Sequence, residues 1–138
     1  MLLLFILMVV LTGCVAVVEP TIAKINITIN PNPVPYNSVS GYWRYTLNLY
    51  EKNGIGVTLT SLKFDHYNQE EELVLAQYEE DIAVWFGSNY LRAFSLLQAA
   101  GVTHKGTGTV KFVIITVEGI DDKDNPIEAT GRVDFLPQ

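Results

Sequence analysis

Residues 42–60, YWRYTLNLYEKNGIGVTLT, decide the fold of this chain of 138 residues. From Trp43 to Leu49 every second residue is apolar or aromatic, a period of two that is typical of a β-strand with one buried face. Asn53-Gly54 readily adopts positive φ angles and predicts a hairpin turn. The β-rich residues 57–60 then return as a second strand. The stretch predicts antiparallel β structure.

Similar signals continue on both sides of this stretch. Further strands are expected at 22–29, 73–75, 94–100, 110–118 and in a final segment that ends near Phe135. Apolar parity changes between Leu59 and Leu62, which predicts a β-bulge near Ser61. Residues 79–86, in which acids precede apolar residues, predict one short crossover helix that ends at Gly87.

These elements amount to about seven strands at a spacing of roughly ten residues, which predicts an all-β antiparallel sandwich, with a barrel as the alternative. Three prolines within residues 30–35 cannot donate to a strand ladder, so we expect this segment to shield a sheet edge. Glycines at 101, 106 and 108 predict a loop. The expected core consists of Trp43, Tyr45, Leu47, Phe112, Ile114 and Phe135.

The N-terminus carries the most specific motif. Met1 to Val10 is an apolar run too short to span a membrane but matched to the apolar region of a secretion signal. Leu11-Thr12-Gly13-Cys14 follows and resembles the lipobox of bacterial lipoproteins. The resemblance implies cleavage between Gly13 and Cys14 and acylation of Cys14, whose lipid chains would anchor the protein in a membrane of the bacterial envelope, facing the periplasm or the exterior.

On this interpretation residues 1–13 are the signal peptide, residues 14–21 are the lipidated cysteine and a tether, and residues 22–138 are the domain. The apolar stretch continues to Val18, so two alternatives stay open: a transmembrane helix over residues 1–18 and a buried core helix. Cys14 is the only cysteine, so the domain itself has no thiol.

The body of the chain also resembles a family. Residues 27–34, 81–93 and 117–122 look like segments of bacterial immunoglobulin-like domains of secreted and envelope proteins. The resemblance implies an immunoglobulin-like sandwich over most of residues 22–136. Its motifs are turn and core residues, so it implies a fold and no reaction.

Charge and motif content narrow the function. Nine basic against 15 acidic residues give a net charge of -6, which excludes a general binder of nucleic acid backbones. The two histidines, His66 and His104, have no second His or Cys at ligand spacing, so zinc is not expected. We interpret His66 as a solvated residue at a sheet edge, with Asp65 on the opposite face. No serine lies in a Gly-x-Ser-x-Gly elbow, and we expect neither a cofactor nor an enzyme.

Three polar or aromatic groups remain as candidates for binding. Hard oxygen ligands on one turn suit calcium, although the same residues stabilise tight turns: Asp121, Asp122, Asp124 and Asn125. Exposed aromatic residues suit an adhesive patch: Tyr42, Tyr50 and Tyr67. An acidic cluster is interpreted as a solvated face: Glu70, Glu71, Glu72, Glu79, Glu80 and Asp81.

Two hypotheses follow. The first is a non-catalytic envelope lipoprotein, held in the membrane by Cys14, that displays its domain for contact with a partner protein or for envelope assembly. The second is a membrane-anchored module that binds carbohydrate or a calcium-dependent ligand through the tyrosines or the acidic turn.

Overall fold

The computed structural model describes residues 15–106 and 110–138. Seven of its strands have six or more residues, which confirms the expected all-β sandwich with one short helix. The strands are β1 (Ile25–Asn30), β2 (Tyr36–Asn37), β3 (Tyr42–Glu51), β4 (Val57–Tyr67), β5 (Leu73–Glu79), β6 (Tyr90–Leu91), β7 (Leu96–Lys105), β8 (Phe112–Asp121) and β9 (Pro126–Asp134), and helix α1 spans Ile82–Phe86.

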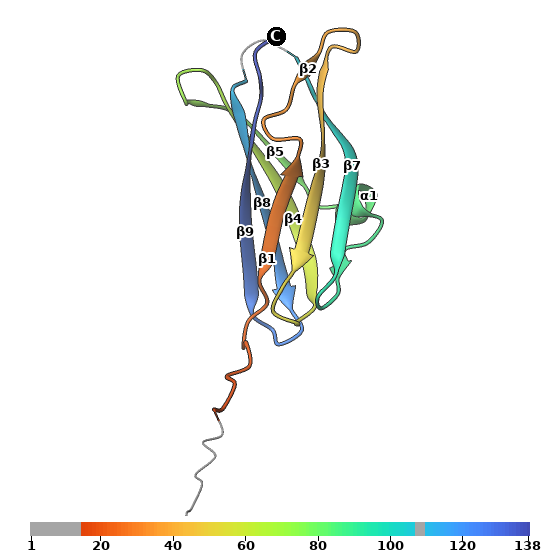
Figure 1. Ribbon diagram of the computed structural model, residues 1–138, viewed down its shortest axis with the longest axis vertical. Helices are drawn as coiled ribbons and strands as arrows, with labels where there is room; N and C mark the ends of the chain where they lie inside the picture. Colours follow the sequence, from red (N-terminus) through yellow and green to blue (C-terminus); the bar gives the residue numbers. More distant parts are fainter. Residues whose placement is uncertain (1–14, 107–109) are drawn as a thin grey trace, which may run out of the picture.

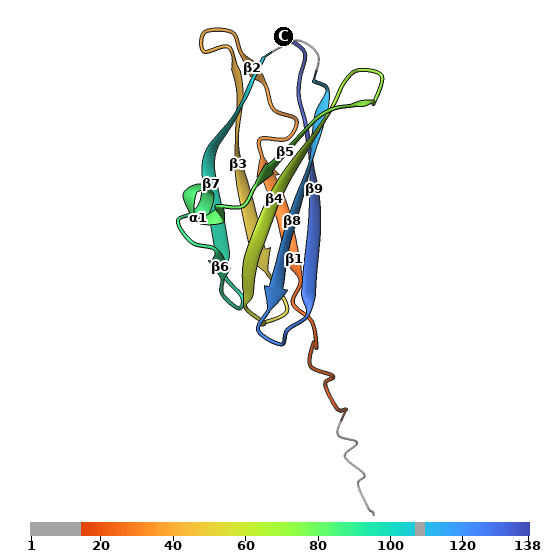
Figure 2. The same ribbon diagram turned by 180° about the vertical axis from the view of Figure 1, so that it is seen from behind.

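The strands form two antiparallel sheets that face each other (Figure 1). In one sheet β3 lies between β7 on one side and β1 followed by β2 on the other. In the second sheet β4 lies between β8 and the edge strand β5, β6 pairs with the start of β4, and β9 flanks β8. Seen from behind, α1 lies beside β7, at the side of the sandwich where the chain leaves β5 (Figure 2).

The hairpin predicted at Asn53-Gly54 is wrong in one respect. β3 and β4 do not pair with each other, because the turn carries the chain from one sheet to the other. The carboxylate of Glu51 accepts hydrogen bonds from the backbone N–H groups of Asn53, Gly54 and Ile55 at 2.8, 2.7 and 3.2 Å. These bonds hold the bend that redirects the chain into the second layer.

The bulge expected near Ser61 is confirmed by a register shift between Leu59 and Ser61 in the pairing of β4 with β8. The shift lets Val57 and Leu59 face the core before it, and Leu62 and Phe64 face the core after it. A strand of this length therefore keeps one buried face in spite of its change in sequence parity.

The core forms between the sheets and includes four of the six expected residues, namely Trp43, Tyr45, Leu47 and Phe135. Trp43 stacks on Phe135 with 4.9 Å between ring centroids, and its indole N–H donates to the Leu136 carbonyl at 2.9 Å. This aromatic group joins the middle of the first sheet to the end of the chain.

The expected orientation of β8 is wrong. Val113, Ile115 and Val117 face the core, whereas Ile114 is half-buried on the outer face. Phe112 is buried outside the main core, where it stacks on Tyr67 at 4.8 Å and the Arg132 guanidinium carbon lies 3.8 Å from its ring centroid. Apolar side chains occur on both faces of β8, so alternation alone does not identify the inner face.

The segment that connects β5 to β7 is only partly as expected. α1 is shorter than predicted, its first turn contains no acid, and it ends at Gly87, which has a φ of 73°. The strand expected over 94–100 is β7, which runs on to Lys105. Gly101, expected in a loop, lies within β7 with a φ of 72°, next to a register shift opposite Tyr45 and Leu47.

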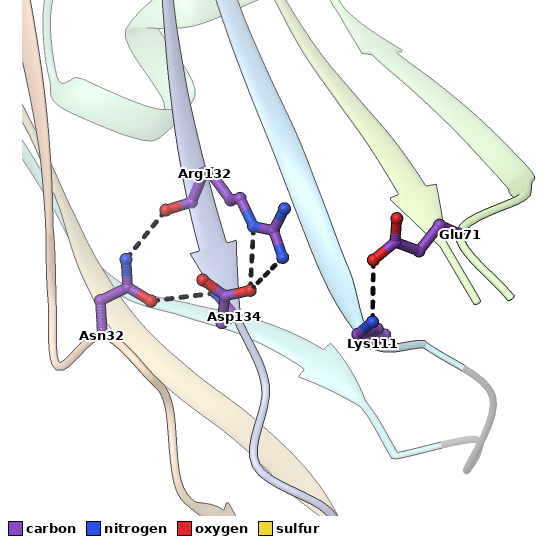
Figure 3. Close-up of polar contacts among 5 residues, drawn as sticks. All are labelled: Asn32, Glu71, Lys111, Arg132 and Asp134. Atoms are coloured by element: carbon purple, nitrogen blue, oxygen red, sulfur yellow. Dashed lines mark hydrogen bonds and ion pairs between the residues drawn. The ribbon is translucent and has the colours of Figure 1, made fainter. Parts of the chain in front are cut away.

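The proline segment shields the outer edge of β9, as expected. The Asn32 amide donates to the Arg132 carbonyl at 2.9 Å, and its oxygen accepts from the Asp134 N–H at 2.9 Å (Figure 3). Val34 bonds to the same edge through an isolated bridge to Phe135. The last residues of β9 are therefore covered at the outer edge by groups of the same chain.

Residues 15–22 are exposed and lead away from the end of the sandwich that is opposite the β4–β5 turn (Figure 1). They join the domain beside the β8–β9 turn, where Asn125 donates to the Thr21 carbonyl at 3.3 Å. Within the part of the chain that the structure describes, no helix is long and apolar enough to cross a membrane.

Candidate functional site

The most exposed apolar element is β5, an edge strand of the second sheet. Leu73, Val74 and Leu75 are 54%, 50% and 54% exposed, and Tyr78 is 64% exposed. Contiguous exposed apolar residues on a sheet edge are unusual, because an open edge invites pairing with other chains. In the sequence, the exposed strand corresponds to an apolar triplet, residues 73–75, between two groups of acids. That pattern predicts a short strand beside a solvated face, and it does not predict that the strand is exposed.

A cavity of about 250 Å³ lies between β5 and β7, on the inner side of the β5 edge. β5 contributes the face that pairs with Phe64 and His66 of β4. The lining residues are His66, Leu75, Gln77, Thr103, His104, Lys105 and Val110. Two of these residues, Leu75 and Val110, are aliphatic and the other five are polar, a mixed lining with room for a side chain of a binding partner.

The two histidines meet inside the sandwich. His66 is 5% exposed, so its expected position as a solvated residue is wrong. Its Nε2 lies 3.1 Å from His104 Nδ1, and His104 Nε2 lies 2.8 Å from the Tyr45 hydroxyl. These contacts form a polar chain from the core to the cavity. Sequence spacing could not reveal this contact. β4 and β7 lie in different sheets, and the two rings meet only because those sheets face each other.

Burial shifts the pKa values of the three hydrogen-bonded groups, His66, His104 and Tyr45. Burial, together with the charge that His66 carries when protonated, lowers the pKa of His104 from 6.5 to about 4. Burial also lowers the pKa of His66 below its ordinary value. Burial raises the pKa of the Tyr45 hydroxyl. At neutral pH the three groups are therefore uncharged hydrogen-bond partners.

Among the described residues, no carboxylate is hydrogen-bonded to His66 or His104. Asp65 points to the other face of β4, as expected, and forms an ion pair with Lys63 at 2.8 Å, so it does not orient His66. Among residues 15–106 and 110–138, no group of three His, Cys, Asp or Glu side chains is placed to hold a metal ion.

The acidic turn stabilises itself. The Asp121 carboxylate accepts hydrogen bonds from the backbone of Lys123 and Asn125, both at 2.9 Å, and from the N–H of Ala23 at 3.1 Å. Asp122 accepts from the Tyr90 hydroxyl at 2.8 Å. Asp124 occupies the turn with a φ of 64°. The carboxylates of this turn thus serve the chain's own backbone and side chains.

The structure does not bring the three candidate tyrosines together. Tyr42 and Tyr50, each 40% exposed, lie near opposite ends of β3. Tyr67 belongs to the other sheet and stacks on Phe112. The lipobox residues Gly13 and Cys14 lie outside the described residues, as does the predicted signal peptide. No protein-family model matches the chain, and no curated protein matches it.

Proposed function

We propose that this chain is a non-catalytic lipoprotein of the bacterial envelope that binds another protein through the edge of its sandwich at β5. The observation that carries the proposal is the exposed apolar edge of β5 beside the β5–β7 cavity. A soluble domain gains nothing in stability from apolar residues exposed in this way, whereas a binding surface uses them. The sandwich would be of the immunoglobulin-like kind, which the crossing from β3 to β4 between the sheets supports.

The anchor on Cys14 is part of this proposal and rests on the lipobox. The geometry of the described tether supports it, because the exposed residues 15–22 leave the domain at the end opposite the β4–β5 turn (Figure 1). A lipid at Cys14 would therefore hold the domain with that turn pointing away from the membrane. The contact surface would be accessible to a partner in the periplasm or outside the cell.

Site-specific photo-crosslinking in cells tests the contact. The full chain is expressed in a bacterial host and carries a photoreactive phenylalanine in place of Tyr78 on β5. The matched control carries it in place of Tyr50, an exposed tyrosine on the other sheet. We expect discrete crosslinked adducts from position 78 and none from position 50. Adducts at position 50 alone would place the contact on the other sheet and contradict the proposal, as would the absence of adducts at both positions.

A further inference from the structure

We propose that β5 binds its partner by strand addition, and that the partner is an extended segment with an alternating apolar centre and basic residues at both ends. This inference rests on the proposed function, since it specifies how the β5 edge makes its contact. It follows from the open backbone of β5, from the side chains on its two faces, and from the charge at its two ends.

The backbone of β5 is open on one side. Within the described residues, the backbone of β5 pairs only with β4. Alternate residues of an edge strand direct their N–H and C=O groups away from the sheet, ready for a further strand. At the opposite edge of the same sheet, Asn32 bonds to Arg132 and Asp134 and so covers the last residues of β9 (Figure 3). β5 has no such cover among the described residues.

The side chains of β5 suit an added strand on both faces. Leu75 and Gln77 share the inner face with His66 and Phe64 and line the β5–β7 cavity. The cavity of about 250 Å³ has room for one or two side chains of the added strand, and an apolar one would contact Leu75 and Val110. On the outer face Ala76 and Tyr78 pair with Asp65 and Lys63 and are exposed. Main-chain bonds would supply affinity, and the cavity would select an apolar residue at alternate positions.

Acidic residues border β5 at both ends. The six residues are Glu70, Glu71 and Glu72 before the strand and Glu79, Glu80 and Asp81 at and after its end. Four cations lie near this edge. Lys111 binds Glu71 at 2.9 Å (Figure 3), and the charge of Arg132 also reaches Glu71. Lys63 is paired with Asp65 on the outer face, and Lys105 lines the β5–β7 cavity. Most of this negative charge is therefore available to a partner, and it favours lysine or arginine at the ends of an added strand.

The same charges oppose a second copy of this chain as the occupant. Antiparallel self-pairing centred on Ala76 would place Glu72 opposite Glu80 of the other copy and Glu71 opposite Asp81. Like charges directly opposite each other destabilise a strand pair. Charged residues beside an open edge are a known means by which proteins suppress self-association while leaving the edge available. A partner with basic ends meets no such penalty.

Three synthetic peptides test the inference with the full chain in detergent micelles. The first has seven alternating valines and threonines between pairs of lysines. The second replaces the lysines with glutamates. The third is the basic peptide with N-methyl groups on two consecutive central residues, which blocks both of its backbone edges and keeps its side chains. Binding is followed by NMR through amide shifts and slowed hydrogen exchange in residues 73–79.

We expect the basic peptide to bind and to protect amides of β5, and the acidic and N-methylated peptides not to do so. The triple variant Glu70→Gln, Glu80→Gln, Asp81→Asn should weaken binding of the basic peptide by about tenfold at low salt, as three partly screened charges would. The double variant Glu118→Gln, Glu128→Gln neutralises exposed acids on β8 and β9 and should leave the affinity unchanged.

The inference is overturned if the basic peptide leaves β5 amides unchanged, if the acidic or N-methylated peptide binds equally well, or if β5 becomes protected by dimerisation without peptide. The crosslinking test separates this failure from failure of the proposed function. Adducts at position 78 without peptide binding would reject strand addition and leave the protein contact in place. Absence of both would reject the two together.

Discussion

Replacement of Glu51 by glutamine tests how the chain passes from one sheet to the other. Glu51 is fully buried, with 0% of its surface exposed, and its carboxylate gathers five backbone N–H groups. They belong to the start of β1, the turn after β3 and the loop before β7: Lys24, Asn53, Gly54, Ile55 and Phe94. One side chain therefore fixes three segments that are distant in sequence.

The cost of Glu51→Gln follows from which oxygen is lost. An amide keeps one acceptor oxygen, and its NH₂ group then faces donors that it cannot satisfy. With the NH₂ group at the Oε1 position, the N–H groups of Lys24 and Asn53, at 3.2 and 2.8 Å, lose their partner. Each partly buried, unpaired donor costs about 1–2 kcal/mol, so we expect a loss of about 2–4 kcal/mol in the free energy of unfolding.

The assay is urea unfolding of residues 15–138 followed by tryptophan fluorescence. A loss of this size lowers the midpoint by about 1–2 M urea for a domain of this length. The control is Glu118→Gln, because Glu118 is exposed and bonds only to the Ser61 hydroxyl, at 2.7 Å. The control should change stability by less than about 0.5 kcal/mol. Equal stability of the two variants would refute the role assigned to Glu51.

Acid titration provides a second test of Glu51. Burial acts to raise the pKa of Glu51, but hydrogen bonds from Asn53, Phe94, Lys24 and Gly54 outweigh it and lower the pKa below the ordinary value of 4.5. A carboxyl whose pKa is lower in the folded state stabilises the fold above pH 4.5, and this contribution disappears as the pH falls through the lowered value. The stability gap between the native chain and Glu51→Gln should therefore narrow between pH 5 and pH 2, and a constant gap would refute the argument.

Three further predictions concern the turns and the histidines. Burial acts to raise the pKa of Asp121, but hydrogen bonds from Asn125, Ala23 and Lys123 lower it from 3.8 to about 2, so carboxyl NMR should show Asp121 ionised at pH 3; protonation near pH 4 would contradict this. Because that carboxylate already binds the chain's own donors, millimolar calcium should leave Tm unchanged, and a rise of more than about 2 °C would indicate a calcium site. The pKa of His104 is lowered from 6.5 to about 4 in the folded state, so between these pH values the unfolded state binds more protons than the folded state. The free energy of unfolding should therefore fall as the pH drops from 6.5 to 4. The urea midpoint of His104→Gln should depend less on pH than that of the native chain, and equal dependence would contradict the assignment.

The sequence predicted those features that depend on neighbouring residues. Alternation located the long strands, the change of parity located the bulge at Ser61, and Gly87 marked the end of α1. These features follow from backbone geometry and from which face of a strand is apolar. The proline segment also shields an edge as expected, although only the structure identifies that edge as β9.

The remaining features depend on which elements meet in space. A turn sequence such as Asn53-Gly54 specifies that the chain bends, but not that β4 enters the other sheet through a bend held by the Glu51 carboxylate. Val113 and Ile114 are both apolar, so the inner face of β8 is decided by its register with β4. His66 and His104 are neighbours because their strands lie in facing sheets. The site at β5 was missed for the same reason, since whether a strand has one neighbour or two is not encoded in its own residues.

The proposed lipid on Cys14 would decide where this domain acts, and the intact mass of the membrane-extracted protein tests it most directly. The full chain, with a basic segment placed before Met1, is expressed in a bacterial host beside Cys14→Ala. The account predicts a mass that begins at Cys14 and includes diacylglycerol and acyl groups, and it predicts that the substitution abolishes both cleavage and lipid. An uncut chain without lipid in the membrane fraction would contradict the account and favour a transmembrane anchor over residues 1–18.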